Sequence, residues 1–365
     1  MEEEKNVDYL IIFSVITLLF IGIIMILSAS SIRSYSLYGD SYYLFKRQFV
    51  FVLIGIISMI IFMKIDYHVF EKYARLFLLI SIILLIIVLI PGIGTIAGGS
   101  RRWLEIGMLR IQPSELAKLG FVIYVSRFIS QKHERIKNFS NGVLPLVIVL
   151  CVIFVLILLE PDMGTALTIA VTFFVMLFVG GVKLSHLMFM FSGALPLFMY
   201  FIMAEPYRRR RLFAFLDPWK DPLNTGYHII QSLLALGSGG LFGVGLGSSR
   251  QKFLYLPEPG TDFIFAVLGE ELGLMGALVV VILYFLLAWR GIKTALSAPD
   301  MFGSLLAMGI TTMIVLQAFI NIGVVTASIP VTGITLPFIS YGGTSLVIML
   351  SGVGILLNIS SNTVD

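Results

Sequence analysis

Long apolar runs separated by short polar segments make up most of the chain between residues 9 and 360. Ten of these runs approach or reach the roughly 20 residues that an α-helix needs to cross a hydrocarbon core of about 30 Å. The pattern therefore predicts an all-α, polytopic integral membrane protein. The predicted spans are residues 9–29, 48–63, 76–91, 114–130, 143–160, 163–181, 186–204, 263–288, 303–325 and 344–360.

The composition strengthens this prediction and excludes several functions. Of 365 residues, 58% are hydrophobic and 13% are charged, against about 25% charged in a typical soluble domain. We therefore expect one membrane domain over residues 1–365. The single cysteine, Cys151, cannot form an internal disulfide. The sequence has no Walker A motif and no zinc-type Cys/His spacing, and the glycine-rich run at 243–247 lacks the spacing of a dinucleotide fingerprint.

The orientation of the spans follows less directly from the charges. An even number of spans places both termini on one side. The Lys and Arg count favours cytoplasmic termini only when the longest loop, about residues 205–262, is set aside as too long for the rule. On that reading the long loop is extracellular. Within it, residues 229–249 are apolar but rich in glycine. Because glycine disfavours helices, we predict a loop that packs on or dips into the outer leaflet.

Charges gather in the stretch Arg250–Gly273, RQKFLYLPEPGTDFIFAVLGEELG, where the long loop enters the eighth span. Lys252 lies near its start, and Asp262 stands at the mouth of the apolar run. An ionisable group at the edge of a bilayer is costly unless a polar cavity or a partner compensates it, so it is a functional candidate. The carboxylate of Asp262 could instead cap the following helix, and both roles stay open.

A second group of charges lies at the start of the fourth span. Glu115 and Lys118 are three residues apart on one helical face and can form an ion pair. Lys118 could be a lysine that extends its ammonium toward the membrane surface. It could also form a cationic wall for an anionic headgroup, with Arg101 and Arg102 as the outer rim.

Three other polar segments remain. In the Glu160–Thr165 turn, Asp162 is expected to cap the sixth span, and the role of Glu160 stays open. The four arginines of 208–211 could attract anionic lipid headgroups or capture a lipid pyrophosphate, whereas nucleic acid is not expected on an extracellular face. The loop at 331–345, VTGITLPFISYGGTS, breaks an apolar run with proline and glycine, as segments that line membrane sites do.

These motifs resemble one known family. NIGVVTASIPVTGITLPFISYGGTS, RQKFLYLPEPGTDFIFAVLGEELG and RRW…QPSELAK are similar to the SEDS family of shape, elongation, division and sporulation proteins. The likeness covers the whole chain and is greater to the FtsW and SpoVE branch than to the RodA branch. It implies a peptidoglycan glycosyltransferase that polymerises lipid II outside the bacterial cytoplasmic membrane. It also implies that Asp262 is the family's essential aspartate and that Glu115 and Lys118 are its functional pair.

The resemblance further implies partners and chemistry. Asp262 would be the general base at the acceptor hydroxyl, with lipid II and the nascent lipid-linked glycan as substrates and a class B penicillin-binding protein as partner. A divalent metal, Mg or Mn, could share the electrostatic work, but its ligands stay unknown. A lipid II flippase or transporter, or a non-catalytic division scaffold, stays open as an alternative. The candidate substrate-binding residues are Arg101, Arg102, Glu115, Lys118, Arg210, Lys252 and Ser340.

Overall fold

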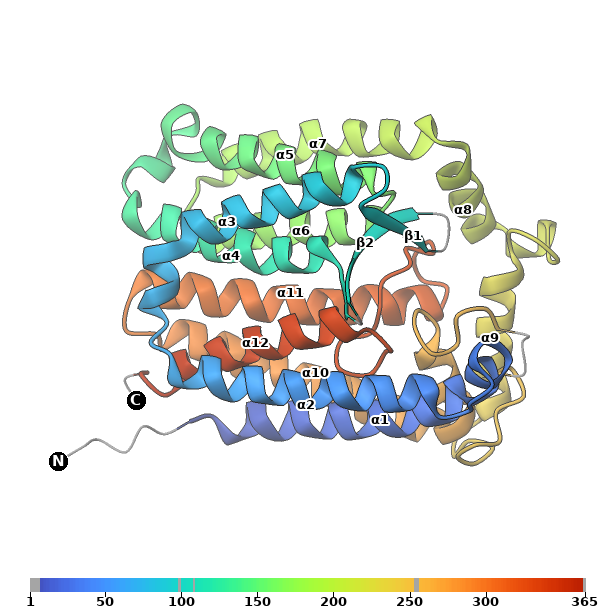
Figure 1. Cartoon of the computed structure of the whole chain (residues 1–365). Coiled ribbons are helices and arrows are strands. Elements are labelled where there is room, and N and C mark those ends of the chain that lie inside the picture. The colour runs from blue at the N-terminus through green and yellow to red at the C-terminus, as the bar shows by residue number, and fades with distance from the viewer. Residues whose placement is uncertain (1–6, 98–99, 108, 253–255, 364–365) are drawn as a thin grey trace.

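The computed structural model describes residues 7–97, 100–107, 109–252 and 256–363. The extreme termini, which are predicted to be cytoplasmic, lie outside the described residues. A helix forms over each of the ten predicted ranges (Figure 1). These helices are α1 (Tyr9–Tyr38), α2 (Tyr43–Lys64), α3 (His68–Leu89), α4 (Pro113–Gln131), α5 (Leu144–Leu159), α6 (Met163–Val179), α7 (Leu184–Ala204), α10 (Ile264–Leu296), α11 (Met301–Val325) and α12 (Gly343–Ser360).

The helices confirm a polytopic membrane fold. Eight helical segments among the described residues are long and apolar enough to cross a membrane, and α6 is apolar but shorter. Helix α4 is not one of the eight, and its sequence contains Glu115, Lys118 and Arg127. The number of ten spans therefore stays a prediction.

The two ends of the helical bundle differ. The start of α1 and the end of α12 lie at one end, and the other end carries a small sheet and two further helices, α8 (Pro206–Leu216) and α9 (Tyr227–Gly239), as Figure 1 shows. Three short helical turns complete the helical elements: η1 (Arg135–Lys137), η2 (Phe139–Val143) and η3 (Pro218–Lys220). The long predicted loop is thus partly helical.

The fold is mostly helical, as predicted, and includes one small sheet. Strands β1 (Gly94–Ala97), β2 (Ser100–Ile106) and β3 (Leu109–Ile111) pair antiparallel in the order β1-β2-β3 between α3 and α4. The sheet gives the charged residues of β2 and β3 a defined geometry at this end of the bundle.

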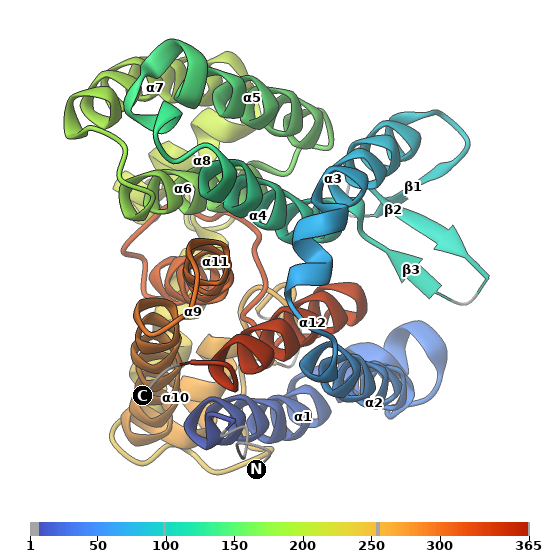
Figure 2. The same cartoon turned by 90° about the vertical axis from the view of Figure 1, so that its left-hand side faces the viewer.

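The packed core lies around α11 and α12, which are the most deeply buried of the membrane helices. Helix α12 packs closely on α2, where the hydroxyls of Ser58 and Ser351 are 2.7 Å apart and Asn358 Nδ2 donates to the Met63 carbonyl at 2.8 Å. Helix α7 is at the periphery, with Leu187 as its only buried residue (Figure 2).

The prediction of a loop over 229–249 is wrong for its first half, which forms α9 against α10. The glycines gather at the end of this helix and after it, so they do not weaken its first turns. A Cβ at Gly239 would lie 2.0 Å from the Gly269 carbonyl oxygen. Glycine is therefore required for the close approach of α9 to α10.

Helix α10 is broken at Gly273, whose φ of 68° is left-handed. The segment after α9 fits into this break: Val244 N–H donates to the Glu270 carbonyl at 3.0 Å, and Leu274 N–H donates to the Gly240 carbonyl at 2.9 Å. The long loop is thereby hydrogen-bonded to the backbone of α10, the helix that follows Asp262.

Candidate active site

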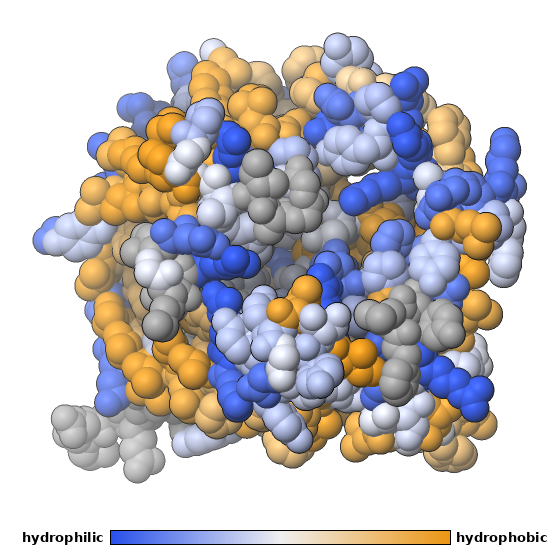
Figure 3. All heavy atoms as spheres, turned by 45° about the vertical axis from the view of Figure 1, so that its right-hand side comes forward, coloured by the Kyte–Doolittle hydropathy of each residue, from blue (hydrophilic) through white to orange (hydrophobic). Residues whose placement is uncertain are grey.

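A cavity of about 910 Å³ opens at the end of the bundle opposite the termini. Its walls come from the end of α1 and the start of α2, the sheet, the starts of α4 and α6, helices α8 and α9, and the loops before α10 and α12. In Figure 3, hydrophilic surface surrounds a hollow at this end, and hydrophobic surface lies along the flanks. The cavity therefore gathers most of the polar segments that the sequence places on one side of the membrane.

Asp262 lies in the cavity wall, at the end of a turn whose backbone is held by three contacts. Asn321 Nδ2 donates to the Asp262 carbonyl at 2.8 Å, Ser340 Oγ donates to the Thr261 carbonyl at 2.6 Å, and Tyr341 N–H donates to the Gly260 carbonyl at 2.8 Å. Two elements distant in sequence thus fix the turn before α10. Ser340 itself is buried and holds this turn rather than lining the cavity.

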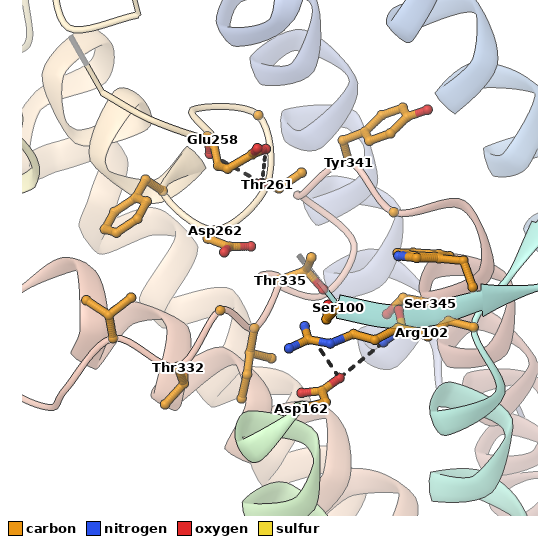
Figure 4. Close-up of a pocket in the computed structure, with 18 of the residues that line it drawn as sticks. Ser100, Arg102, Asp162, Glu258, Thr261, Asp262, Thr332, Thr335, Tyr341 and Ser345 are labelled. Atoms are coloured by element: carbon orange, nitrogen blue, oxygen red, sulfur yellow. Dashed lines mark hydrogen bonds and ion pairs between the residues drawn. The ribbon is translucent and has the colours of Figure 1, made fainter. Parts of the chain in front are cut away.

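The carboxylate of Asp262 faces the cavity (Figure 4). Among the residues that the structure describes, none donates a hydrogen bond to it, and the N-cap of α10 is Phe263 without a side-chain cap. The capping role considered for Asp262 is therefore wrong. Burial, and then the nearby charge of Glu258, raise the pKa of Asp262 to about 6, while Arg102 and Arg211 oppose the rise.

Arg102 faces Asp262 from strand β2 (Figure 4). Neighbouring strand residues point to opposite faces, and Arg101 accordingly turns away, donating to the Leu89 carbonyl at 3.2 Å. Arg102 Nε donates to the Glu160 carbonyl at 2.9 Å, and its Nη2 donates to the Pro161 carbonyl. Of the predicted pair, only Arg102 lines the cavity.

The turn beside Arg102 confirms one prediction. Asp162 caps α6, its carboxylate accepting from Thr165 N–H at 3.1 Å. Glu160 is fully buried, and both of its carboxylate oxygens lack a partner among the described residues. Burial, and then the charge of Asp162, raise the pKa of Glu160 to about 9. Glu160 is therefore a neutral acid at neutral pH.

The arginine cluster contributes a different member from the one predicted. Helix α8 places Arg211 at the cavity, with Nη1 donating to the Val331 carbonyl at 3.3 Å, whereas Arg210 is exposed outside the lining. Only one face of a helix can meet a cavity, so a run of four arginines cannot all line it. A predicted helix over residues 206–216 would have assigned the four arginines to different faces, of which only one meets the cavity.

Glu115 and Lys118 form the predicted ion pair, with Lys118 Nζ 3.0 Å from Glu115 Oε2. Glu115 lines the cavity and also accepts from Ser345 Oγ at 2.9 Å. Lys118 lies behind it, buried, and donates to Gln317 Oε1 at 2.6 Å, while Gln317 Nε2 donates to the Thr335 carbonyl at 3.0 Å. Lys118 thus supports the loop that lines the cavity, but is not part of the cavity wall.

Lys252 also lies outside the cavity lining. Its ammonium is buried against Glu271 Oε1 at 2.9 Å, Ser28 Oγ at 2.9 Å and the Gly247 carbonyl at 2.7 Å. These contacts occupy its three donors. The neighbouring Glu270 accepts from Arg250 N–H at 2.9 Å, so this acidic pair is also engaged in the long loop.

Two further cavity residues were not singled out from the sequence. His228 of α9 stacks on Phe263, with ring centroids 5.9 Å apart, and burial lowers the pKa of its imidazole. Glu258, in the PEPG segment at residues 257–260, also lines the cavity. The signal available was the position of Glu258 four residues before Asp262 in the same motif. No group of three His, Cys, Asp or Glu side chains that could hold a metal occurs in the described part of the chain.

Comparison with known proteins agrees with this arrangement. A family model for the FtsW, RodA and SpoVE type, described as "Cell cycle protein", matches residues 8–365. The chain belongs to this family. It is 47% identical over 358 residues to Stage V sporulation protein E of Bacillus subtilis, covering 98% of both chains. It is 43% identical over 361 residues to a probable peptidoglycan glycosyltransferase FtsW of Geobacter metallireducens, covering 99% of this chain and 96% of that one.

A solved structure supports the fold as well. A chain of a peptidoglycan synthase complex, studied for its coordination of polymerization and crosslinking, superposes with a TM-score of 0.80 at 30% identity. The match covers 97% of this chain and 98% of that one. The family membership expected from the sequence motifs is confirmed.

Proposed function

We propose that this chain is a peptidoglycan glycosyltransferase that polymerises lipid II, with Asp262 as general base. The observation that carries the proposal is the Asp262 carboxylate, which faces a large cavity while the backbone of its turn, residues 260–262, is fixed by Asn321, Ser340 and Tyr341. One relative is named a probable peptidoglycan glycosyltransferase FtsW, and this name supports the reaction class. The other is named a sporulation protein.

In the proposed reaction, the Asp262 carboxylate accepts the proton of the acceptor sugar's hydroxyl. The hydroxyl oxygen forms a bond to the donor's anomeric carbon, and the bond from that carbon to the lipid pyrophosphate breaks, the pyrophosphate leaving with the electron pair. A base works best when its pKa is near the working pH. The pKa of about 6 leaves Asp262 mostly ionised at neutral pH while keeping it more basic than a free aspartate.

The positive charges of the cavity suit an anionic leaving group. Arg102 and Arg211 line the same cavity as Asp262 from two different elements. Guanidinium groups match phosphate geometry, and donors fixed in place before the reaction lower the barrier by stabilising developing charge. We assign the donor pyrophosphate to these two residues. Glu115, which also lines the cavity, would contact substrate, with Lys118 positioning it.

The membrane setting follows from the same proposal. The protein would lie in the bacterial cytoplasmic membrane with cytoplasmic termini, so that the cavity opens outward and the lipid tails lie against the apolar flanks seen in Figure 3. A class B penicillin-binding protein would supply crosslinking, in line with the synthase complex that this chain resembles.

The direct test uses purified full-length protein in detergent, with and without such a partner, given lipid II. The expected product is glycan strands resolved by gel electrophoresis. A flippase needs a membrane with two sides and forms no polymer in detergent, and a scaffold forms none anywhere. Failure to form glycan under either condition would reject the polymerase proposal.

Sidedness is tested by cysteine labelling in a Cys151→Ser background. Leu223 is strongly exposed beyond α8, and Asn138 is exposed at the other end of the bundle. Leu223→Cys should react with a membrane-impermeant thiol reagent on intact cells, and Asn138→Cys only after permeabilisation. The reverse pattern would place the cavity in the cytoplasm, where glycan could not reach the wall.

A further inference from the structure

The turn that carries Asp262 is tied to α1 by a two-pronged ion pair. Arg33 donates from Nη2 to Glu258 Oε1 at 2.6 Å and from Nη1 to Glu258 Oε2. Both side chains line the cavity. They are 37% and 46% exposed, so water screens the pair and its contribution to folding stability is small. Its placement beside Asp262 suggests another role.

Glu258 begins the turn that carries Asp262. Its carbonyl accepts from Thr261 N–H at 3.2 Å and from Phe263 N–H at 3.4 Å. Thr261 Oγ1 donates to Glu258 Oε2 at 3.2 Å. Glu258 has a φ of 50°, a left-handed conformation that costs a non-glycine residue about 1 kcal/mol or more. In Figure 4, Glu258 and Asp262 lie on the same turn.

Asp262 therefore has a carboxylate neighbour that is itself held by an arginine. The charged and titratable groups that face this part of the cavity come from α1, β2, the N-cap of α6, α8, α9 and the turn itself; they are Arg33, Arg102, Asp162, Arg211, His228 and Glu258. Six more line the other walls: Tyr38 of α1, Arg47 of α2, Arg110 of β3, Glu115 of α4, Tyr207 of α8 and Tyr341 of the loop before α12. Within the first group, Glu258 is the only carboxylate on the same turn as Asp262.

We propose that the Arg33–Glu258 pair sets the proton affinity of Asp262, with both acting as positioning residues for the base. The Glu258 carboxylate disfavours a second negative charge nearby and so makes Asp262 more basic, while Arg33 limits this effect. The two partners consequently act on Asp262 with opposite sign. The inference rests on the proposed base role of Asp262.

The opposite signs give a test that a purely structural brace cannot imitate. Glu258→Gln and Arg33→Met both break the ion pair. Removing the negative charge should lower the pKa of Asp262, so the acid limb of the rate profile moves to lower pH. Removing the positive charge should raise that pKa, so the limb moves to higher pH. The shift for Glu258→Gln should be on the order of one pH unit, the shift for Arg33→Met should be smaller because Asp262 has the weakest of the charge interactions that act on Arg33, and the double variant should fall between the two.

The measurement is the initial rate of lipid II polymerisation by purified protein across the acid and neutral range, with thermal melting as the check on folding. Lys46→Met is the matched control, because Lys46 pairs with Asp40 in the α1–α2 connection outside the cavity lining; its acid limb should not move. If Arg33→Met does not fold, Arg33→Lys keeps the charge and should keep the wild-type limb, and Glu258→Gln decides the question.

Shifts in the same direction, or an unmoved acid limb in folded and active Glu258→Gln protein, would overturn the inference. That result differs from failure of the proposed function. If Asp262→Asn still polymerises lipid II, Asp262 is not the base and the limb reports another group. If Asp262→Asn is inactive while both limbs stay in place, only the role of the Arg33–Glu258 pair is rejected.

Discussion

The stretch Arg250–Gly273 contains two kinds of acidic group that look alike in the sequence. Asp262 faces the cavity with a carboxylate that receives no hydrogen bond from the described residues. Glu271, nine residues later, is buried and accepts from Lys252, Ser28 and the Ser249 backbone. The same cost of burying charge is thus met in one case by partners and in the other by a polar cavity. Within this stretch, Glu271 is held through Oε1 by three partners, whereas the Asp262 carboxylate remains available to a ligand in the cavity.

Asp262→Asn should produce the largest effect on activity. The substitution keeps the shape of the side chain and leaves the backbone contacts of Asn321 and Ser340 in place, while removing the base. Polymerisation of lipid II should fall by roughly 10²–10⁴-fold, the usual contribution of general base catalysis. Thermal melting should be unchanged. Retention of more than about a tenth of the rate would contradict the base role.

Lys252→Met, near the start of the same stretch, should lower stability and leave the rate unchanged, the reverse of Asp262→Asn. Removing the ammonium leaves Glu271 buried without its charge partner, a loss of about 3–5 kcal/mol in comparable buried pairs. The yield of folded protein and the melting temperature should drop, while each folded molecule keeps its rate. Lys46→Met, at an exposed pair, is the control. If the variant melts normally but loses activity, Lys252 binds substrate, as the sequence predicted.

Lys118→Met should have an intermediate effect on stability. It removes the partner of Glu115 and the donor that holds Gln317 behind the 331–335 loop. Glu115→Gln keeps an oxygen for Ser345 and leaves Lys118 bonded to Gln317, so its melting temperature should fall less. If Lys118→Met melts normally but has a raised KM for lipid II, Lys118 contacts substrate after all.

Glu160→Gln should give the smallest effect, and one that depends on pH. The pKa of Glu160 is about 9 in the folded chain, against a usual value of 4.5. Between these values the folded state binds more protons than the unfolded state, so wild-type stability falls as pH rises. Glutamine does not titrate. The melting temperature of the variant relative to wild type should therefore increase from acid to alkaline pH, and a constant difference would contradict the neutral state of Glu160.

The length of the apolar runs predicted a helix in each of ten ranges because lipid-facing and core residues in those ranges are both hydrophobic. A different argument, from the low helix propensity of glycine, failed for α9. The glycine content of 229–249 was averaged over the segment, although the glycines fit the close contact with α10 and the connection after it. Long-range packing of this kind cannot be read from local propensity.

The candidate site was predicted in part for a similar reason. Asp262, Arg102 and Glu115 lie at the cavity because charged residues at span ends have few other compensations. Arg211 replaced Arg210 because helical phase selects one face, and Lys252 was lost to a partner 19 residues away in sequence. The order of residues along the chain does not reveal which charged side chains will form ion pairs in the fold.

The interlocked backbones of α9, its following loop and α10 have a consequence for genetics. A Cβ at Gly239 would meet the Gly269 carbonyl oxygen at 2.0 Å, and one at Gly243 would meet the Glu271 carbonyl oxygen at 2.2 Å. Neither neighbour is a side chain that can turn aside, so alanine at either position must force the two segments apart. Such substitutions leave every cavity side chain intact and weaken only the joint that supports them. Alanine variants at these two glycines are therefore the natural choice for temperature-sensitive alleles, functional in cool cultures and inactivated by a shift to higher temperature.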